Sequence, residues 1–492
     1  MASTQELKEV RLGKLNTIKK AGINPYPVKT ERTHNIVEII NKYGRLSFAK
    51  KEVTIVGRIM SMRGQGALAF IDLDDGTGRF QVFFKKDNNI KYDGVKIENT
   101  FSFFKDVVDE SDFIQVTGKL FKTKKGQKTI EVTKWKIVSK SLVPIPNEFY
   151  GLKDEDEKYR KRYLDILLNK EVKEMIQKKS IFWNTIRSFL LERDYVEVQT
   201  PVLESVTGGA DARPFVTHHN ALDMKVYLRI SAGELWQKEL MVAGLPKTFE
   251  IGRIFRNEGM SNEHLQDYTQ VEFYEAYSDY DKGMALVKDL YRKVAKETFG
   301  TTKFNISDTE VDLAGEWEIY DFVAILKERF SVDATNVEVE ELKKVLTENK
   351  VRFDKNINKE KAVDALWKSI RGEFTGPGFL INIPVFLEPL AKKNPNNEKT
   401  VQRFQIILGG SEMGKGFSEL NDPVDQLERF QHQDQMRKGG DEEAQMNNND
   451  FVEALEYGMP PAFGFGISER LFSVLSGKSI RETTIFPMMR KK

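Results

Sequence analysis

The sequence predicts a two-domain α+β protein. A small five-stranded β-barrel precedes a larger domain built on a mostly antiparallel sheet flanked by helices. Three observations lead to this prediction. The chain has 492 residues, too many for one compact core. Five short β-branched and aromatic runs, separated by glycine and aspartate turns, lie within residues 51–140. Beyond them, strand patterns alternate with loops and helices, as in an α+β domain.

The N-terminal part combines a helix with the predicted barrel. Residues 6–20 read as a basic helix ended by Gly22 and Pro25, so we assign residues 1–50 to a helical extension. The five runs of residues 51–140 favour an oligonucleotide-binding (OB) barrel. Residues 1–140 hold 27 Lys and Arg against 16 Asp and Glu, a net charge of +11, whereas the remainder carries −9. Charge alone leaves open a nucleic-acid surface or a merely solvated basic face.

Two prolines and a charged run separate the two domains. A linker is predicted over residues 141–165 from Pro144, Pro146 and the run KDEDEKYRKRY, and the second, larger domain is expected at residues 166–492. An amphipathic helix is expected at 171–193, followed by the strand VEVQTP, which Pro201 stops.

Strand patterns dominate the rest of the second domain. TFEIGRIFRNE and YTQVEFYEAY predict two antiparallel strands around the polar loop GMSNEHLQD. Residues 335–372 read as a polar helical insertion. RFQIILGGSEMGKGFSEL predicts strand, turn and strand, and a charged helix follows from Asp422 to Arg437. A glycine-rich strand runs into the final helix in FGFGISERLFSVLSG.

Composition excludes several classes of protein. The chain has no cysteine, which rules out a disulfide framework, a thiolate metal site and a cysteine nucleophile. Five histidines make a multi-histidine zinc site a poor candidate. The longest apolar stretch, Phe379 to Leu390, is short and contains Glu388, so no membrane span is expected. The start MASTQELKEV has no secretion pattern. We therefore expect a cytoplasmic protein without a membrane partner.

Acidic and cationic groups gather on the expected strands of the second domain. Arg256 and Glu258 are expected to share one strand face at i, i+2, as are Glu272 and Tyr274 on the next strand. Further charges are expected around a GKGF turn and at the start of the last helix: Glu412, Glu419 and Arg470. Any one pair is more commonly a surface ion pair. Together they suit a substrate that carries both phosphate and ammonium.

Glycine pairs give a weaker signal. Gly208–Gly209 and Gly409–Gly410 permit close approach of a ligand to the backbone, but a tight turn is the favoured explanation of each pair taken alone. The glycines of GFGIS lack the surrounding unit of a dinucleotide site.

Longer blocks of sequence carry a resemblance to a known family. They include GLKDEDEKYRKRYLDIL, VEVQTPVLESVTGGADARPFVTHHNALDMKVYLRI, FEIGRIFRNEGMS, EFYEAYSDY, GFSELNDPVDQLERF, ALEYGMPP and RETTIFPMMR. With these blocks, the chain resembles the class II lysyl-tRNA synthetases from near residue 5 to the C-terminus. The three class II motifs occur in order, ending at Pro201, within IFRNE and at Arg470. The resemblance implies activation of L-lysine with ATP and Mg²⁺, transfer to tRNA(Lys), and a homodimer formed through the first motif.

The resemblance assigns anticodon contacts to the OB barrel. Phe70 matches an aromatic ring that stacks on an anticodon base, and Gln81 matches a contact to a base edge. Arg63 and Glu131 match further anticodon contacts. The alternative is that Phe70 belongs to the barrel core and Gln81 is a solvent-facing strand residue.

The resemblance also assigns two groups of residues to the active site. The ATP group comprises Arg256 on the α-phosphate, Glu258 on the adenine amino group, His264 near the γ-phosphate, Tyr268 stacked on adenine, Glu412 as a magnesium ligand, and Arg470 on the γ-phosphate. The lysine group comprises Gly208, Gly209 and Glu272 at the α-amino group, Arg256 and Lys415 at the carboxylate, Tyr274 and Phe417 along the side chain, and Glu234 and Glu419 at the ε-ammonium. Burial of an ammonium requires such carboxylates.

Four positions depart from the family pattern. Gln405 stands where a second metal-binding Glu is common, and an amide is a poorer ligand. Lys415 stands where many members have an Asn. RISAGEL has one residue more than the usual RIAPEL, which affects the register of Glu234, and Glu469 occupies an Asp position.

Two other functions compete with lysine activation. An aspartyl- or asparaginyl-tRNA synthetase shares the barrel and the three motifs, but its substrate side chain needs cations or a mix of hydrogen-bond donors and acceptors, whereas Glu234 and Glu419 are acidic. A catalytically silent, tRNA-binding paralogue is the second alternative. The retention of catalytic residues argues against it: Arg256, Glu258, Glu412 and Arg470.

Overall fold

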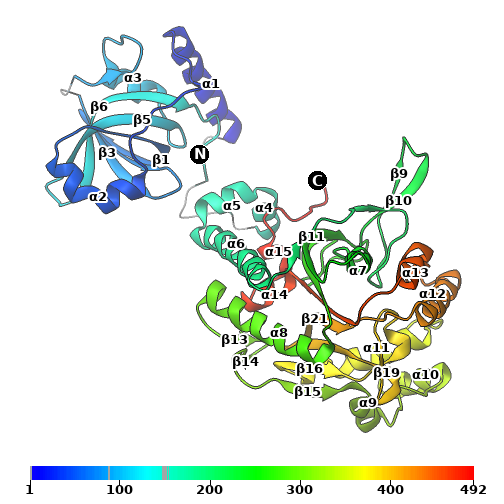
Figure 1. The fold of residues 1–492 in the computed structure, drawn as a ribbon. Coiled ribbons are helices and arrows are strands. Elements are labelled where there is room, and N and C mark those ends of the chain that lie inside the picture. Colours follow the sequence, from blue (N-terminus) through cyan, green and yellow to red (C-terminus); the bar gives the residue numbers. More distant parts are fainter. Residues whose placement is uncertain (1–2, 87–88, 147–151, 153, 492) are drawn as a thin grey trace. The chain divides into compact units, whose positions relative to one another are not determined.

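The chain forms two compact units, residues Met1–Lys158 and Tyr159–Lys492. The computed structural model describes residues 3–86, 89–146, 152 and 154–491 (Figure 1). The first unit is a β-barrel and the second combines helices with a mostly antiparallel sheet. These two architectures confirm the predicted fold class.

The five predicted strands of the first unit close into a barrel. They follow the order β3-β2-β1-β5-β6, and a parallel pairing of β3 with β6 completes the circle. Their bounds are β1 Val53–Gln65, β2 Leu68–Asp74, β3 Arg79–Lys85, β5 Phe113–Lys122 and β6 Lys128–Ser139; the short β4 (Lys91–Tyr92) also pairs with β6. Side chains alternate along each strand, so Ala69 and Ile71 face the core while Phe70 between them faces outward.

Three helices accompany the barrel: α1 (Thr4–Lys20), α2 (Ile36–Phe48) and α3 (Thr100–Val107). The helix expected at residues 6–20 is α1, which a Ser3–Glu6 capping box begins. Aromatic rings of α3 and the strands build the core, with Phe104 packed against Phe84 and Trp135.

The expected linker over 141–165 is partly helical. Residues 147–151 and 153 lie outside the described residues. Beyond them the charged run forms α4 (Glu155–Arg160) and α5 (Arg162–Leu168). A buried ion pair of 2.6 Å joins Arg162 and Asp165, one turn apart on α5, a spacing at which opposite charges favour a helix.

An eight-stranded sheet forms the centre of the second unit. Its order is β15-β16-β20-β21-β22-β12-β11-β7, antiparallel throughout except for the two edge pairs, which are parallel. The bounds are β15 Glu318–Asp321, β16 Gly378–Ile381, β20 Arg403–Leu408, β21 Ser411–Ser418, β22 Ala462–Ser468, β12 Asp267–Ala276, β11 Lys247–Phe255 and β7 Val196–Glu197. The long strand expected at VEVQTP is reduced to β7.

The two faces of this sheet have different surroundings. Helices α6 (Lys170–Leu191), α8 (Tyr280–Val294) and α14 (Arg470–Leu475) pack over one face, where alternate side chains such as Phe273 and Phe465 form the core. The intervening residues face the opposite side, and Glu272 is one of them. The opposite face therefore remains available for a cavity.

Further helices enclose that second face: α7 Glu234–Val242, α9 Phe322–Phe330, α10 Val339–Glu348, α11 Lys359–Ile370, α12 Pro423–Lys438 and α13 Asn449–Glu456. They share a hydrophobic core that includes Trp367, Leu380 and Phe430. Smaller strands are β8 Leu203–Glu204, β9 Val216–His219, β10 Met224–Leu228, β13 Lys303–Ile306, β14 Thr309–Asp312, β17 Ile383–Pro384, β18 Lys393–Asn394 and β19 Asn397–Val401; the short helix α15 spans Ile480–Thr483.

Two expectations about local structure were wrong. Arg256 and Glu258 do not share a strand, because β11 ends at Phe255 and both lie in the loop that follows. The GKGF segment is not a turn but part of β21. The turn lies at Gly409–Gly410, where positive φ angles of 56° and 72° suit glycine.

The structure bears on membrane insertion in one respect. None of the helices in the described ranges is both long and apolar enough to cross a membrane.

Candidate active site

A cavity of about 560 Å³ lies on the sheet face opposite α8. Two cross-strand rows form its floor: Gln405, Lys415, Gly466 and Glu272 in one, and Arg403, Phe417, Gly464 and Tyr274 in the other. Directly paired residues point to the same face of a sheet, so each row turns its side chains into the cavity. The strand pairing of β20, β21, β22 and β12 thus assembles residues that are far apart in the sequence.

Glycines of β22 form the centre of this floor. A Cβ atom at Gly464 would collide with the Glu419 carboxylate and the Tyr274 ring. Gly466 lies opposite both Lys415 and Glu272. The two glycines leave bare backbone between polar side chains, a surface on which a ligand can lie closely.

One end of the cavity is rich in arginine. Arg256 donates from Nε to the Ile230 carbonyl at 3.3 Å, and its guanidinium lies 5.9 Å from the Tyr268 ring centre. Arg470, at the start of α14, forms an ion pair with Glu263 of the β11–β12 loop. Its Nε is buried and has no hydrogen-bond partner in the described part of the chain. This cationic end is suited to an anionic group such as phosphate.

The remaining residues of the predicted ATP group also line the cavity. Glu258 and His264 are exposed on the loop after β11, and the His264 ring hydrogen-bonds Ser261 at 2.9 Å. Helix α11 forms the facing wall: the Trp367 indole N–H donates to Glu412 Oε1 at 2.9 Å, which ties the expected insertion to the site.

The predicted magnesium ligands are partly engaged by cations. The Arg371 guanidinium lies 3.6 Å from Glu412, and Arg403 donates to the Gln405 amide oxygen at 2.6 Å. Among residues 3–86, 89–146, 152 and 154–491, no group of three or more His, Cys, Asp or Glu could hold a metal ion. Glu412 alone fits a magnesium ion that arrives with phosphate oxygens, since Mg²⁺ commonly uses one or two carboxylates plus substrate phosphates.

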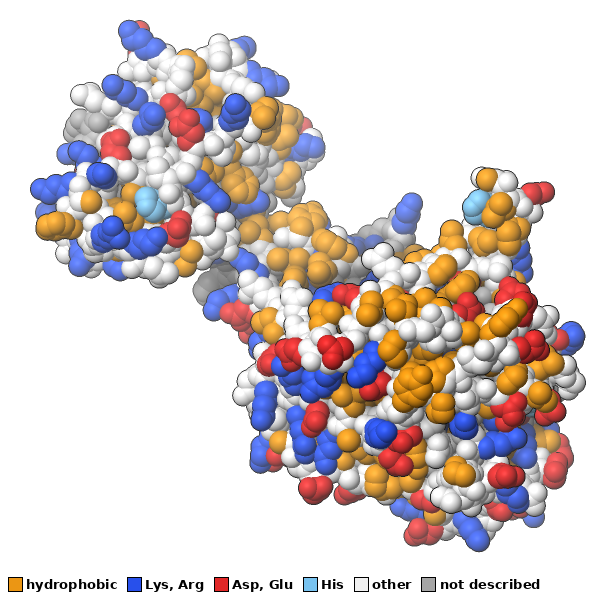
Figure 2. Space-filling view, viewed as in Figure 1, with side chains coloured by type: hydrophobic (Ala, Val, Ile, Leu, Met, Phe, Trp, Pro, Cys, Tyr) orange, Lys and Arg blue, Asp and Glu red, His pale blue; other side chains and the backbone are white. Residues whose placement is uncertain are grey.

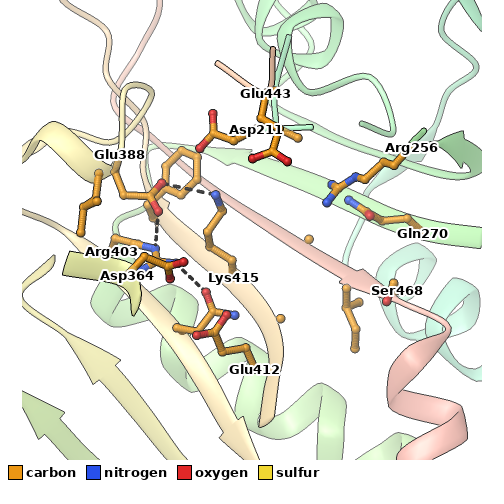
Figure 3. A pocket seen from close by; sticks show the side chains of 18 of the residues that line it. Asp211, Arg256, Gln270, Asp364, Glu388, Arg403, Glu412, Lys415, Glu443 and Ser468 are labelled. Atoms are coloured by element: carbon orange, nitrogen blue, oxygen red, sulfur yellow. Dashed lines mark hydrogen bonds and ion pairs between the residues drawn. The ribbon is translucent and has the colours of Figure 1, made fainter. Parts of the chain in front are cut away.

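Lys415 faces a carboxylate that sequence reasoning did not assign to the site. Glu388 lies 3.3 Å from the Lys415 ammonium and 2.9 Å from Arg403, and both side chains turn toward it in Figure 3. Nearby, burial raises the pKa of Asp211 to about 6, although Lys415 opposes this shift. The signal for Glu388 was its position as the charged residue in the apolar run from Phe379 to Leu390.

The opposite end of the cavity is acidic. Glu272 accepts hydrogen bonds from the Ala232 N–H at 2.8 Å and the Tyr274 hydroxyl at 3.0 Å. Burial, and then the neighbouring Glu234, raise the pKa of Glu272 to about 7. Gly209 lines the cavity with a φ of 84°, and a Cβ there would collide with Ser231 and Glu234; Gly208 is buried beside it.

At this end, Glu234 and Glu419 share one buried ammonium of the protein. Glu234 is the first residue of α7 and lines the cavity; Gly233 precedes it with a φ of 78°. Glu419 lies behind the wall, fully buried. The ammonium of Lys238, which sequence reasoning did not single out, lies 2.8 Å from Glu234 and 2.5 Å from Glu419. The four-residue spacing of Glu234 and Lys238 was its signal.

Glu469, which stands where the family pattern has the shorter Asp, has a structural role. It is buried just before Arg470, forms an ion pair with Lys179 of α6, and accepts a hydrogen bond from the Thr269 N–H at 3.0 Å. The residue therefore fastens the start of α14 to both α6 and β12.

A second candidate surface lies on the outside of the barrel. Arg63, Phe70, Phe83 and Glu131 form one cross-strand row, and Gln81 lies in the next row. Phe70 and Phe83 stack with ring centres 4.7 Å apart. Phe70 is half-buried and faces outward, so it is not a barrel-core residue; the Thr129 hydroxyl donates to Gln81 at 2.8 Å. Lys and Arg side chains are spread over the face of this unit that Figure 2 shows.

Comparison with known proteins agrees with this fold and site. The family described as tRNA synthetases class II (D, K and N) matches residues 154–490, and the OB-fold nucleic acid binding domain matches residues 53–138. The fold and the cavity thus define a class II tRNA synthetase.

Curated relatives identify the branch of that class. Lysine–tRNA ligase of Thermoanaerobacter sp. is 43% identical over 100% of this chain and 98% of its own length. The enzymes named lysine–tRNA ligase from Fervidobacterium nodosum and Bacillus subtilis are 40% and 39% identical, over 99% and 98% of this chain and 94% and 97% of their own lengths. The chain belongs to the lysine–tRNA ligase family.

Proposed function

We propose that this protein activates L-lysine with ATP, forming lysyl-adenylate and pyrophosphate, and then transfers lysine to the 3′-terminal adenosine of tRNA(Lys). One observation carries the proposal: a single cavity has an arginine-rich end and an acidic end, joined by a floor of bare glycine backbone. The first end suits a triphosphate and the second suits a diammonium amino acid. Similarity over the full chain to curated lysine–tRNA ligases supports it.

ATP is expected to lie at the arginine-rich end. Arg256 would bind the α-phosphate and Arg470 the γ-phosphate, where its unpartnered buried Nε needs an acceptor. Tyr268 would stack on adenine, Glu258 would accept from the adenine amino group, and His264 would lie near the γ-phosphate.

Magnesium would be held by Glu412 together with the ATP phosphates. Bound there, the ion neutralises charge on the phosphate oxygens. Gln405 is the weaker candidate, because an amide that already accepts from Arg403 has less to offer a cation. We therefore expect fewer protein-bound magnesium ions than two carboxylates would support.

Lysine is expected to lie across the glycine floor. Glu272 and the Gly208–Gly209 backbone would bind its α-amino group, while Arg256 and Lys415 would attract its carboxylate. Tyr274 and Phe417 would flank the methylenes. Glu419 and Glu234 would receive the ε-ammonium, and Glu419 Oε1 supports this assignment because it is buried without a hydrogen-bond partner among the described residues.

No protein nucleophile is needed for either step. A carboxylate oxygen of lysine attacks the α-phosphorus in line, the bond to the bridging oxygen breaks, and pyrophosphate leaves. The terminal ribose hydroxyl of tRNA then attacks the adenylate carbonyl, and AMP leaves. Charge develops on phosphate oxygens, so positioning and arginine electrostatics supply the catalysis.

The barrel would bind the tRNA anticodon. Phe70 offers an outward aromatic face for base stacking, Gln81 an amide for a base edge, and Arg63 and Glu131 flank them in the same surface. Because charged tRNA is used in translation, we expect a cytoplasmic enzyme.

We also expect a symmetric homodimer. Exposed apolar side chains recur around the first motif: Ile181, Leu191, Val196, Val202 and Leu203. Such clustering is typical of an isologous interface. Light scattering that shows a stable monomer at micromolar concentration would contradict the dimer.

ATP–pyrophosphate exchange with each of the twenty amino acids tests the function. Exchange should depend on lysine and require no tRNA. Activation of aspartate or asparagine would favour the nearest rival enzymes, and exchange with none would favour a silent tRNA-binding protein.

A further inference from the structure

A lysine of the protein itself lies at the acidic end of the cavity. Lys238 is 1% exposed, one helical turn after Glu234 on α7. Its ammonium bridges Glu234 at 2.8 Å and Glu419 at 2.5 Å, carboxylates that come from elements almost two hundred residues apart. A buried ammonium is costly unless carboxylates surround it, so this bridge is a built feature rather than a chance contact.

The surroundings of Lys238 are those expected around the substrate ammonium. Its Nζ lies 5.9 Å from the ring centre of Tyr274 and 5.3 Å from that of Phe417, within the range of cation–π attraction. Lys238 does not line the cavity, whereas Glu234, Tyr274 and Phe417 do. The Lys238 ammonium therefore lies behind Glu234. The substrate ammonium would approach Glu234 from the cavity, and would approach Glu419 past the bare backbone of Gly464.

The carboxylates retain capacity for a second cation. Glu419 Oε2 forms an ion pair with Lys238, but neither carboxylate oxygen has a hydrogen-bond partner among the described residues, and Oε1 lies where a Cβ of Gly464 would stand. A carboxylate offers about four lone-pair positions. One ammonium from the protein and one from a ligand can share it.

The net charge of the cluster formed by Glu234, Glu419 and Lys238 follows from its members. Glu234 comes from α7, Glu419 follows β21, and Lys238 is the cation; together they carry a net charge of −1 when ionised. The other titratable groups packed against them are Glu272 and Tyr274, both from β12, and Glu272 is reserved for the α-amino group. One ε-ammonium therefore brings the side-chain end of the cavity to neutrality.

We propose that Lys238 is a built-in counter-ion that sets the side-chain end of the cavity to one negative charge and positions Glu234 and Glu419 for a single ammonium. This inference rests on the proposed function, because it takes the bound side chain to be that of lysine. Lys238 acts through the two carboxylates and is a positioning and specificity residue, not a catalytic one.

The ionisation states of Lys238 and Glu419 depend on each other. Burial alone would lower the pKa of Lys238, but Glu234 and Glu419 raise it overall, so the ammonium stays charged. Burial raises the pKa of Glu419, and Lys238 is the group that opposes this rise most strongly. Without Lys238, Glu419 would take up a proton at a higher pH and lose its charge for the substrate.

Three variants test the charge count by pyrophosphate exchange: Lys238→Met, Glu419→Gln and the double variant. With every remaining carboxylate ionised, Lys238→Met leaves −2 and Glu419→Gln leaves 0, whereas the double variant restores −1. Because Glu419 takes up a proton more readily without Lys238, the −2 state of Lys238→Met is reached only at high pH. Each single change should raise the KM for lysine at least tenfold above pH 8, where Glu419 of the wild-type protein is ionised, with the KM for ATP unchanged. Lys238→Met should also shift the lysine pH profile upward, and Lys238→Arg should keep the wild-type profile.

The double variant is decisive. Its KM for lysine should fall below that of Glu419→Gln alone, and it removes both buried charges of the pair, so it should fold even where Lys238→Met does not. A double variant as poor as the product of the single losses would overturn the proposal. Two results for Lys238→Met would also overturn the proposal. Tighter binding of lysine would mean that Lys238 competes with the substrate ammonium, and wild-type behaviour would mean that Lys238 has no effect on lysine binding. Failure of the wild-type protein to activate lysine would overturn the proposed function instead, together with this inference.

Discussion

We expect individual side chains at the acidic end of the cavity to decide which amino acid binds. Glu419→Gln keeps the shape but removes the charge that is expected to receive the ε-ammonium. The loss of lysine activation should be large, about 2–5 kcal/mol by analogy with broken buried charge pairs. Norleucine lacks the amine and should lose much less. Comparison of exchange rates with both amino acids checks this, and equal losses would remove Glu419 from side-chain recognition.

The same carboxylates predict a pH dependence. Burial raises the pKa of Glu419 to about 8 and that of Glu272 to about 7. Both are protonated below these values and cannot then pair ionically with an ammonium. The value of kcat/KM for lysine should therefore rise between about pH 6 and pH 8 and level off above, because kcat/KM reports ionisation of the free enzyme. Norleucine should retain the lower step and lack the upper one; a flat lysine profile would contradict the prediction.

At the scale of elements, the β11–β12 loop holds Arg470 before ATP arrives. Glu263 of this loop pairs with the Arg470 guanidinium, which the γ-phosphate is expected to need. Glu263→Gln should therefore lower the KM for ATP. The carboxylate is 43% exposed, so the gain should be modest, up to about fivefold. Glu263→Asp is the matched control. A higher KM in the Gln variant would mean that Glu263 assists ATP binding.

Sequence patterns predicted elements better than their ends. The helix expected at 171–193 is α6 at Lys170–Leu191, because apolar periodicity over six turns is a strong signal. The strand expected to carry Arg256 stops one residue earlier, since the residues after Phe255 pair with loops instead. The positions of the strands in the chain could be inferred from their patterns. Their order and register in the sheet could not, because these depend on long-range packing. It is this order that aligns Gln405, Lys415, Gly466 and Glu272.

Some residues of the candidate site could also be predicted from the sequence, and others could not. Residues within recognisable blocks, such as Arg256 and Glu272, were found from the sequence and line the cavity. Lys238 and Glu388 were missed as site residues because each reaches its partners only in the folded chain: Lys238 meets Glu419, and Glu388 meets Arg403 and Lys415. Charge in an apolar context was visible in the sequence, but its partner was not.

At the scale of the whole molecule, the two units should be separable by assay. Arg256→Ala removes a cation from the α-phosphate and should slow adenylate formation by at least about 10²–10³-fold, the scale for loss of one oxyanion donor. Phe70→Ala should weaken tRNA binding by about 1–3 kcal/mol through lost stacking. Pyrophosphate exchange without tRNA should respond to the first change only.

The outcome of that pair is easily read. If Phe70→Ala cripples tRNA-free exchange, or if Arg256→Ala leaves exchange intact, the proposed division of labour between barrel and catalytic unit is wrong. The KM for tRNA, measured on both variants, supplies the complementary readout.

The alternation of side chains along β12 and β22 has a consequence for how the protein can change. Phe273, Phe463 and Phe465 belong to the core beneath α8, while Glu272 and Gly464 face the cavity. On these strands, the odd-numbered residues Phe273, Phe463 and Phe465 contribute to thermal stability, and the even-numbered residues Glu272 and Gly464 are expected to contribute to activity. Random substitution there should separate into variants with a lower Tm but normal activity per folded molecule, and variants with a normal Tm and little activity. A lineage could therefore adapt to a new temperature through one parity of positions without disturbing its chemistry.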